Sequence, residues 1–106
     1  MFYFNRDLNP EIVEPGEIRI VRAHGGTLMM AEFRYEKGGR AKLHSHPHEQ
    51  VAYIIEGELD FTVGEETQHV VEGDSIYIPS GVVHGCEALT LSRVLDVFSP
   101  QREDFI

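Results

Sequence analysis

The sequence predicts a single all-β domain, and three observations support this. Short runs rich in β-branched and aromatic residues follow one another from about residue 17 to residue 98. None of these runs has the periodicity of an amphipathic helix. Glycine-containing turns separate them roughly every 8 to 12 residues, the spacing expected of an antiparallel sandwich or barrel.

Seven strands are expected, each bounded by glycine, proline or acidic residues. They cover residues 17–23, 27–36, 50–57, 58–64, 67–73, 75–81 and 91–98. Alternation is clearest in residues 27–36, where four apolar side chains share one face: Met29, Ala31, Phe33 and Tyr35. We expect this face to be core, with Glu32 and Arg34 on the opposite face.

The length of 106 residues indicates one domain, which is large enough to bury a single core. We expect an N-terminal arm over about residues 1–15, a barrel over about 16–99 and a C-terminal tail over 100–106. The single cysteine, Cys86, has no partner for an intramolecular disulfide and is expected to be a small buried residue.

Charge excludes some classes of partner. Eighteen acidic residues against nine basic ones give a formal net charge of -9, which argues against nucleic acid and anionic membranes as partners. No stretch approaches the roughly 18 apolar residues of a membrane span, and the N-terminus lacks the pattern of a secretory signal, so we expect a cytoplasmic protein. An anionic small molecule would need a local positive group.

Residues 44–50 read HSHPHEQ, which is either a metal site or a histidine-rich polar loop. In an extended strand His44, His46, His48 and Gln50 point to the same face and can converge on one ion. A further histidine, His84, stands downstream. Imidazole and amide ligands suit a divalent transition metal such as Zn, Ni, Mn, Fe or Co.

Two spacing motifs carry a resemblance to a known family. The first, G-x5-H-x-H-x3-Q-x6-G, is formed by Gly38, His44, His46, Gln50 and Gly57. The second, G-x5-P-x-G-x2-H, is formed by Gly73, Pro79, Gly81 and His84, although Ala88 stands where the full motif has Asn. In order and spacing they resemble the two motifs of the cupins. The resemblance implies a single cupin β-barrel, a double-stranded β-helix or jelly roll, with a metal held by His44, His46, Gln50 and His84.

The remaining polar residues of this region are not expected to be ligands. His48 has the right parity, but Pro47 disturbs the strand and the cupin pattern has no ligand at that position. Glu49 has the wrong parity. His24 and His69 lie outside both motifs and are expected to be ordinary polar residues.

Residues 91–98 contain a possible catalytic acid whose orientation alternation leaves open. Val94, Asp96 and Phe98 share one face, and Leu95 and Val97 share the other. If Asp96 faces inward, it is a desolvated carboxylate near a cation, suited to general acid-base catalysis. If it faces outward, it is a surface acid above a core of Leu95 and Val97.

Five segments in order also resemble the KdgF-type cupins of pectin and alginate breakdown: MFYFN, LMM, HSHPHEQ, IYIPSGVVHG and REDF. This resemblance implies ring opening of 4,5-unsaturated monouronates to linear 5-keto-4-deoxyuronate, with Asp96, Phe98 and Arg102 as catalytic residues. Because most cupins carry Glu where Gln50 stands, the ligands here would leave the metal its full positive charge and make it a stronger Lewis acid.

Two other functions remain open. The first is a cupin dioxygenase, which would need a redox-active iron. The second is a non-catalytic metal- or sugar-binding cupin. In each case the expected partner is a small molecule, with an anionic sugar as the leading candidate. Small cupins commonly pair through their sheets, and Phe2, Tyr3 and Phe4 would give a homodimer further apolar area to bury.

Overall fold

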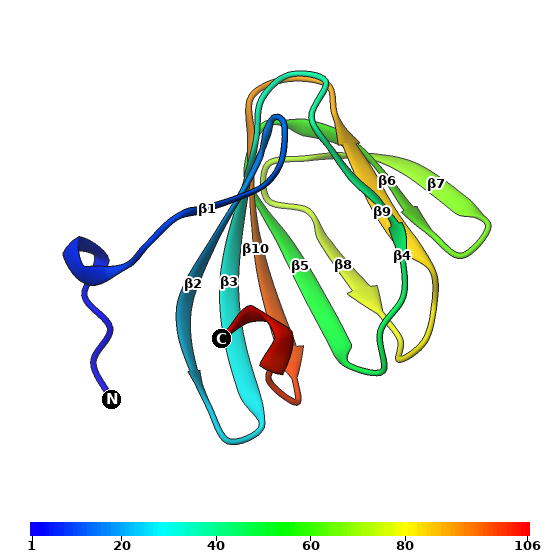
Figure 1. The fold of residues 1–106 in the computed structure, drawn as a ribbon. Coiled ribbons are helices and arrows are strands. Elements are labelled where there is room, and N and C mark those ends of the chain that lie inside the picture. Colours follow the sequence, from blue (N-terminus) through cyan, green and yellow to red (C-terminus); the bar gives the residue numbers. More distant parts are fainter.

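Two antiparallel sheets pack face to face as a jelly-roll sandwich (Figure 1). The structure, a computed structural model, describes residues 1–106. It contains no α-helix, and hence no helix long and apolar enough to cross a membrane. Its elements are η1 (Asn5–Asp7), β1 (Glu11–Glu14), β2 (Glu17–Gly25), β3 (Leu28–Tyr35), β4 (Arg40–His44), β5 (Glu49–Glu56), β6 (Glu58–Val63), β7 (Glu66–Val71), β8 (Ser75–Ile78), β9 (His84–Ala88), β10 (Ser92–Ser99) and η2 (Glu103–Phe105).

The strand order brings distant parts of the chain together. One sheet has the order β1-β2-β3-β10-β5-β8 and the other β4-β9-β6-β7. The last strand, β10, lies between β3 and β5, so that Asp96 stands opposite Ala31 on one side and Ala52 on the other. In the smaller sheet β9 pairs with β4, which places the two cupin-like motifs side by side.

All seven expected strands are present, and three further strands were not expected. β1 was assigned to the arm, but it pairs with β2 and extends the larger sheet. β4 and β9 carry the sequences RAKLH and HGCEA, in which alternation of apolar and polar residues is weak. Pairing with each other, and of β9 with β6, makes them strands.

The predicted core face is confirmed. Met29, Ala31, Phe33 and Tyr35 are each no more than 8% exposed and belong to one cluster of 14 buried side chains between the sheets. Cys86 is buried in the same cluster, as expected. A close-packed interior of this kind fixes the strands that carry polar groups at its open end.

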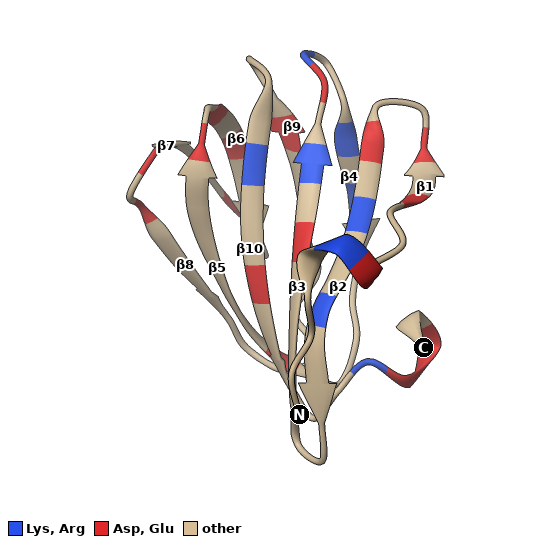
Figure 2. Cartoon of the chain, turned by 90° about the vertical axis from the view of Figure 1, so that its left-hand side faces the viewer, with Lys and Arg blue, Asp and Glu red and all other residues tan.

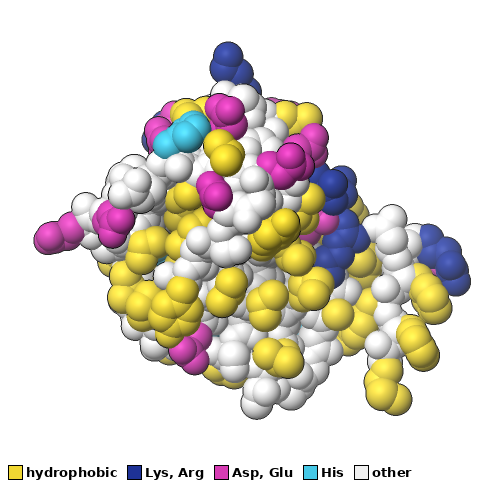
Figure 3. Space-filling view, turned by 180° about the vertical axis from the view of Figure 1, so that it is seen from behind, with side chains coloured by type: hydrophobic (Ala, Val, Ile, Leu, Met, Phe, Trp, Pro, Cys, Tyr) yellow, Lys and Arg dark blue, Asp and Glu magenta, His cyan; other side chains and the backbone are white.

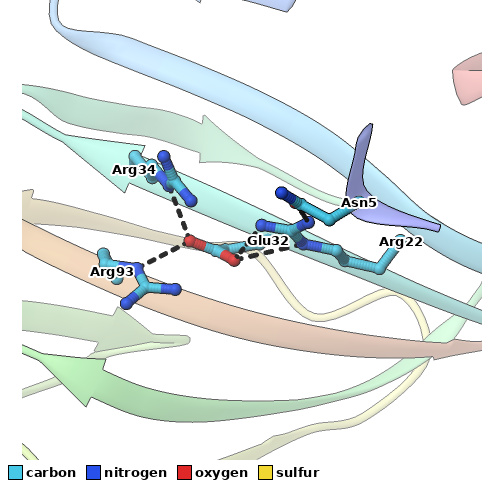
Figure 4. Close-up of polar contacts among 5 residues, drawn as sticks. All are labelled: Asn5, Arg22, Glu32, Arg34 and Arg93. Atoms are coloured by element: carbon cyan, nitrogen blue, oxygen red, sulfur yellow. Dashed lines mark hydrogen bonds and ion pairs between the residues drawn. The ribbon is translucent and has the colours of Figure 1, made fainter. Parts of the chain in front are cut away.

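The outer face of the larger sheet holds one buried acid. Glu32 lies opposite the core face, as expected, but its side chain is only 3% exposed because Arg22, Arg34 and Arg93 cover it (Figure 4). Figure 2 shows acidic and basic positions alongside one another on the neighbouring strands β2, β3 and β10.

The two ends of the chain lie in different surroundings. The arm before β1 extends away from the sheets, whereas η2 folds back over the larger sheet (Figure 1). Phe105 of η2 makes edge contacts with the rings of Phe33 and Phe98, with centroids 6.1 and 5.8 Å away. The tail therefore forms one wall of the space between the sheets.

Candidate metal centre and adjoining cavity

Three histidines of the predicted ligand set meet at one end of the sandwich. His44 on β4 pairs directly with His84 on β9, and their ring centroids are 4.3 Å apart. His46, just beyond β4, has its ring centroid 4.8 Å from that of His84. One ligand nitrogen from each ring lies within 4.8 Å of the others, so the three could hold a metal ion.

Gly85 allows β4 and β9 to approach closely beside these histidines. A Cβ atom at this position would lie 2.7 Å from the carbonyl oxygen of Ala41 and 3.2 Å from the amide nitrogen of Leu43. Both contacts are with backbone, which cannot move aside as a flexible side chain can. Glycine at position 85 therefore keeps His44 and His84 within reach of one ion.

Main-chain carbonyl groups fix the orientation of all three rings. The Nδ1 atoms of His44, His46 and His84 lie 2.7, 3.1 and 2.9 Å from the carbonyl oxygens of Lys42, His48 and Val82, respectively. A carbonyl can only accept a hydrogen bond, so each Nδ1 carries the proton and each Nε2 keeps a free lone pair. This tautomer is the one that binds a metal through Nε2.

Gln50 completes the set in a way that fits a cation. Its side-chain oxygen lies 3.0 Å from Nε2 of His46, and its amide group is near enough to Asp96 to lower the pKa of that carboxyl. Because Nδ1 of His46 carries the ring proton, the Gln50 oxygen presents a lone pair to the lone pair on Nε2 of the imidazole. The Nε2 atom of His84 is also buried without a hydrogen-bond partner. A divalent cation bound by these atoms would satisfy all of them.

Burial keeps the histidines in the metal-binding form. Burial is the largest cause that lowers the pKa of His84 to about 4; the nearby His44, His46 and Arg102 act in the same direction, and the hydrogen bond to the Val82 carbonyl opposes them. Burial and Arg102 also lower the pKa of His46. Both rings are neutral at pH 7 and need lose no proton from Nε2 to bind a metal.

The polar residues that were not expected to be metal ligands lie outside the three-histidine cluster. The ring of His48 contacts that of His46, with centroids 5.3 Å apart, but His48 contributes its carbonyl oxygen rather than a ring nitrogen. Glu49 is exposed and accepts a hydrogen bond from Tyr77. His24 contacts Gln101, and His69 lies on the surface near two acids of β6.

Asp96 faces inward, which answers the question that alternation left open. Burial alternates along β10, with Val94, Asp96 and Phe98 inside and Leu95 and Val97 partly exposed. One carboxyl oxygen of Asp96 is buried without a hydrogen-bond partner. Desolvation by burial raises its pKa to about 7, against the opposing effects of the Gln50 hydrogen bond and the Arg102 charge.

Phe98 and Arg102 lie beside the histidines. Phe98 is 2% exposed, with its ring centroid 5.7 Å from that of His46. The guanidinium of Arg102 lies over the Phe98 ring, 5.3 Å from the centroid, and forms two hydrogen bonds to Asp104, of 3.0 and 2.8 Å. A cavity of about 280 Å³ is lined by both residues together with His44, Gln50, His84 and Asp96.

The cavity also contains charged and polar residues that sequence reasoning did not find. Glu17 and Arg19 of β2 line it, as does Tyr35, whose hydroxyl donates a 3.0 Å hydrogen bond to Glu17. The sequence signal at this strand was misleading. In residues 17–23 the isoleucines alternate with charged residues. Hydrophobicity alone would therefore place Ile18 in the core and Glu17 and Arg19 in solvent, but Ile18 is 36% exposed.

Comparison with known proteins identifies the family. A family model described as the cupin domain matches residues 31–98. The chain is also 32% identical over 107 residues to the pectin degradation protein KdgF of Dickeya dadantii. This match covers 98% of this chain and 97% of the relative. The chain is a cupin of the KdgF family.

Solved structures agree with the assignment of this KdgF-family cupin. KdgF from Halomonas sp. superposes on this chain with a TM-score of 0.94 at 31% identity. The match covers 100% of this chain and 98% of the Halomonas chain. An RmlC-like cupin from Shewanella frigidimarina has the same TM-score at 33% identity, covering 99% of this chain and 95% of its own.

Proposed function

We propose that this KdgF-family cupin opens the ring of 4,5-unsaturated monouronates to give linear 5-keto-4-deoxyuronates, with the help of a bound divalent metal. The observation that carries the proposal is the position of Asp96. It is a buried carboxyl group with one unpartnered oxygen, in the same cavity as the three-histidine cluster. The relationship to a pectin degradation protein supports a sugar acid as the substrate.

The proposed reaction is an isomerisation that needs no co-substrate. The substrate is a cyclic hemiacetal whose ring oxygen is attached to the C4=C5 double bond, next to a carboxylate. Loss of the proton from the C1 hydroxyl forms the C1 aldehyde and breaks the bond from C1 to the ring oxygen. The electron pair remains on that oxygen as an enolate at C5. Protonation at C4 then gives the C5 ketone, so every atom is retained.

The residues of the cavity suit the proton transfers. Asp96 would accept the proton of the C1 hydroxyl and return it to C4, because a pKa near the working pH lets one group act as both base and acid. Phe98 would cover the sugar ring and exclude water, and Arg102 would bind the carboxylate with its planar fork. A divalent cation on His44, His46, Gln50 and His84 would supply a Lewis acid that stabilises negative charge on oxygen.

Loss of the enol-ether absorbance of 4,5-unsaturated galacturonate tests this proposal. Wild-type protein, with its metal content measured, is expected to open the ring faster than the spontaneous reaction. Asp96→Asn is expected to reduce kcat at least about a hundredfold, the lower end of general acid-base catalysis, while retaining its metal. Asp60→Asn on β6 is the matched control and should retain full activity.

The alternatives give different results in the same assay. A dioxygenase would require oxygen, so equal rates under nitrogen and air are expected here and exclude that function. If the wild-type protein holds metal but its rate equals the blank, the ring-opening proposal fails and a binding function takes its place. The corresponding unsaturated monouronate made from alginate, used in the same assay, shows whether one enzyme serves both polysaccharides.

A further inference from the structure

A second arginine lines the cavity, and the proposed reaction gives it no role. Arg19 of β2 and Arg102 of the tail both lie against the ring of Phe105, with guanidinium carbons 4.0 and 4.2 Å from its centroid. Both guanidiniums therefore pack on the same aromatic ring. A ligand with negative charge bound beside this ring would interact favourably with both.

The carboxylates paired with these arginines are more exposed than the guanidiniums. Arg19 donates a 3.1 Å hydrogen bond to Glu11, and its side chain is 17% exposed whereas that of Glu11 is 54% exposed. Arg102 is 11% exposed and its partner Asp104 is 60% exposed. Ion pairs with such exposed acids are screened by water and contribute little. Either arginine could therefore exchange its exposed partner for the carboxylate of a bound ligand at little cost.

Arg19 also has a hydrogen-bond donor without an acceptor. Its Nε atom is buried and has no partner, although Nη2 is bonded to Glu11. Buried donors are nearly always paired, so an unpaired one in a cavity wall points to a missing acceptor. The guanidinium fork matches a carboxylate, which can accept two parallel hydrogen bonds.

We propose that Arg19 is a specificity residue that acts with Arg102 to bind the carboxylate of the sugar acid and to discriminate against neutral sugars. That the bound anion is a uronate rests on the proposed function. The pair of guanidiniums would be the local positive group that a protein of net charge -9 needs to attract an anion. Arg19 supplies binding energy and does not take part in proton transfer.

Steady-state kinetics of Arg19→Gln test this role. We expect the KM for 4,5-unsaturated galacturonate to rise about tenfold or more, the effect of losing one hydrogen bond to a charged group, with kcat within about twofold of wild type. Arg40→Gln on β4, where Arg40 pairs with exposed Glu87, is the control and should leave KM unchanged. An unchanged KM in Arg19→Gln would overturn the proposal.

A purely structural role for Arg19 predicts a different result in a second variant. If Arg19 only fastens β1 to β2 through Glu11, then Glu11→Gln should raise KM as Arg19→Gln does. If Arg19 binds the substrate, Glu11→Gln removes a competing carboxylate, and KM should fall or stay the same. A matching rise in KM in the two variants would therefore overturn the proposal, whatever the thermal stability of either protein.

Binding measurements separate this inference from the proposed reaction. Titration calorimetry with galacturonate and galactose should show tighter binding of the acid to wild-type protein, and Arg19→Gln should remove most of the difference. If the wild-type protein catalyses no ring opening but shows this pattern, the reaction is wrong and Arg19 keeps its role. If wild type and Arg19→Gln bind galacturonate equally, or if neither binds it, Arg19 is not an anion-binding residue.

Discussion

Glu32 is a single carboxylate surrounded by three guanidiniums. Its Oε1 accepts hydrogen bonds from Arg22, the closer at 2.8 Å, and its Oε2 accepts one from Arg34 at 2.7 Å and one from Arg93 at 2.8 Å (Figure 4). Burial acts to raise the pKa of this group, but the hydrogen bonds from the three arginines and the charge of Arg34 lower it to about 2. The ionised form is therefore much more stable in the folded protein than in the unfolded chain.

This pKa predicts a pH-dependent contribution to stability. Because the folded-state pKa is below the usual value of 4.5, the contribution is present above pH 4.5 and is lost as the pH falls toward 2. Glu32→Gln should lower the free energy of unfolding by on the order of 2–3 kcal/mol at pH 7 and by much less near pH 2. Urea unfolding at several pH values measures the difference, and exposed Glu72→Gln should show almost none. An equal difference at pH 7 and pH 2 would contradict the prediction.

At the scale of residues, the sequence predicted the polar cluster better than the rest of the cavity. The two cupin-like motifs grouped His44, His46, Gln50 and His84, and the structure brings these side chains together. The orientation of Asp96 could not be predicted, since both faces of its strand are apolar enough to be core. Arg19 was missed because a charged residue in an alternating strand is ordinarily assigned to solvent.

At the scale of elements, the candidate metal centre depends on the pairing of β4 with β9. These two strands carry His44 and His84, and neither was predicted. Their sequences are short and weakly alternating, and they are strands because β9 pairs with β6 on one side and with β4 on the other. β3, in contrast, could be predicted together with its buried face, because its apolar side chains share one face.

Gly85→Ala tests whether the close approach of β4 and β9 supports metal binding. The added Cβ would push against the backbone of Ala41 and Leu43 and force the strands apart. We expect a loss of stability of about 1–3 kcal/mol, typical of overpacking, and metal binding about tenfold weaker or more. Thermal unfolding and competition with a chelator measure the two effects.

Gly25→Ala is the matched control for this prediction. A Cβ at Gly25 meets nothing within 4 Å, and this residue also lies in a strand. It should leave both stability and metal affinity close to those of wild type. Equal metal affinity in Gly85→Ala and Gly25→Ala would show that the strands can separate without disturbing the ligands.

At the scale of the whole molecule, the outer face of the larger sheet carries apolar residues that lie beside one another on adjacent strands. Val51 on β5 pairs with Tyr77 on β8 and with Val97 on β10, and Val97 pairs with Met30 on β3. Val51, Tyr77 and Met30 are 45%, 56% and 39% exposed. Figure 3 shows apolar side chains spread over the molecule from behind, with more on the projecting N-terminal arm.

We propose that a second copy of the chain covers this face and the arm, because an apolar surface continued by exposed Phe2 and Phe4 suits a self-complementary pair. Sedimentation velocity should give about twice the 12.0 kDa mass of the chain. Val51→Lys should shift the protein to monomer, whereas Val71→Lys, on the edge strand β7, should not. A monomeric wild type at micromolar concentration would contradict the homodimer.

The three carbonyl groups that hold the metal-site imidazoles belong to the main chain. Exchange of the side chains of Lys42, His48 or Val82 would leave these acceptors in place, because every amino acid carries the same carbonyl. Sequence drift at these positions is therefore compatible with an unchanged centre, whereas an insertion or deletion between a ligand and its carbonyl is not. The geometry of this site therefore depends on the number of residues between each ligand and its carbonyl more than on the identity of those residues.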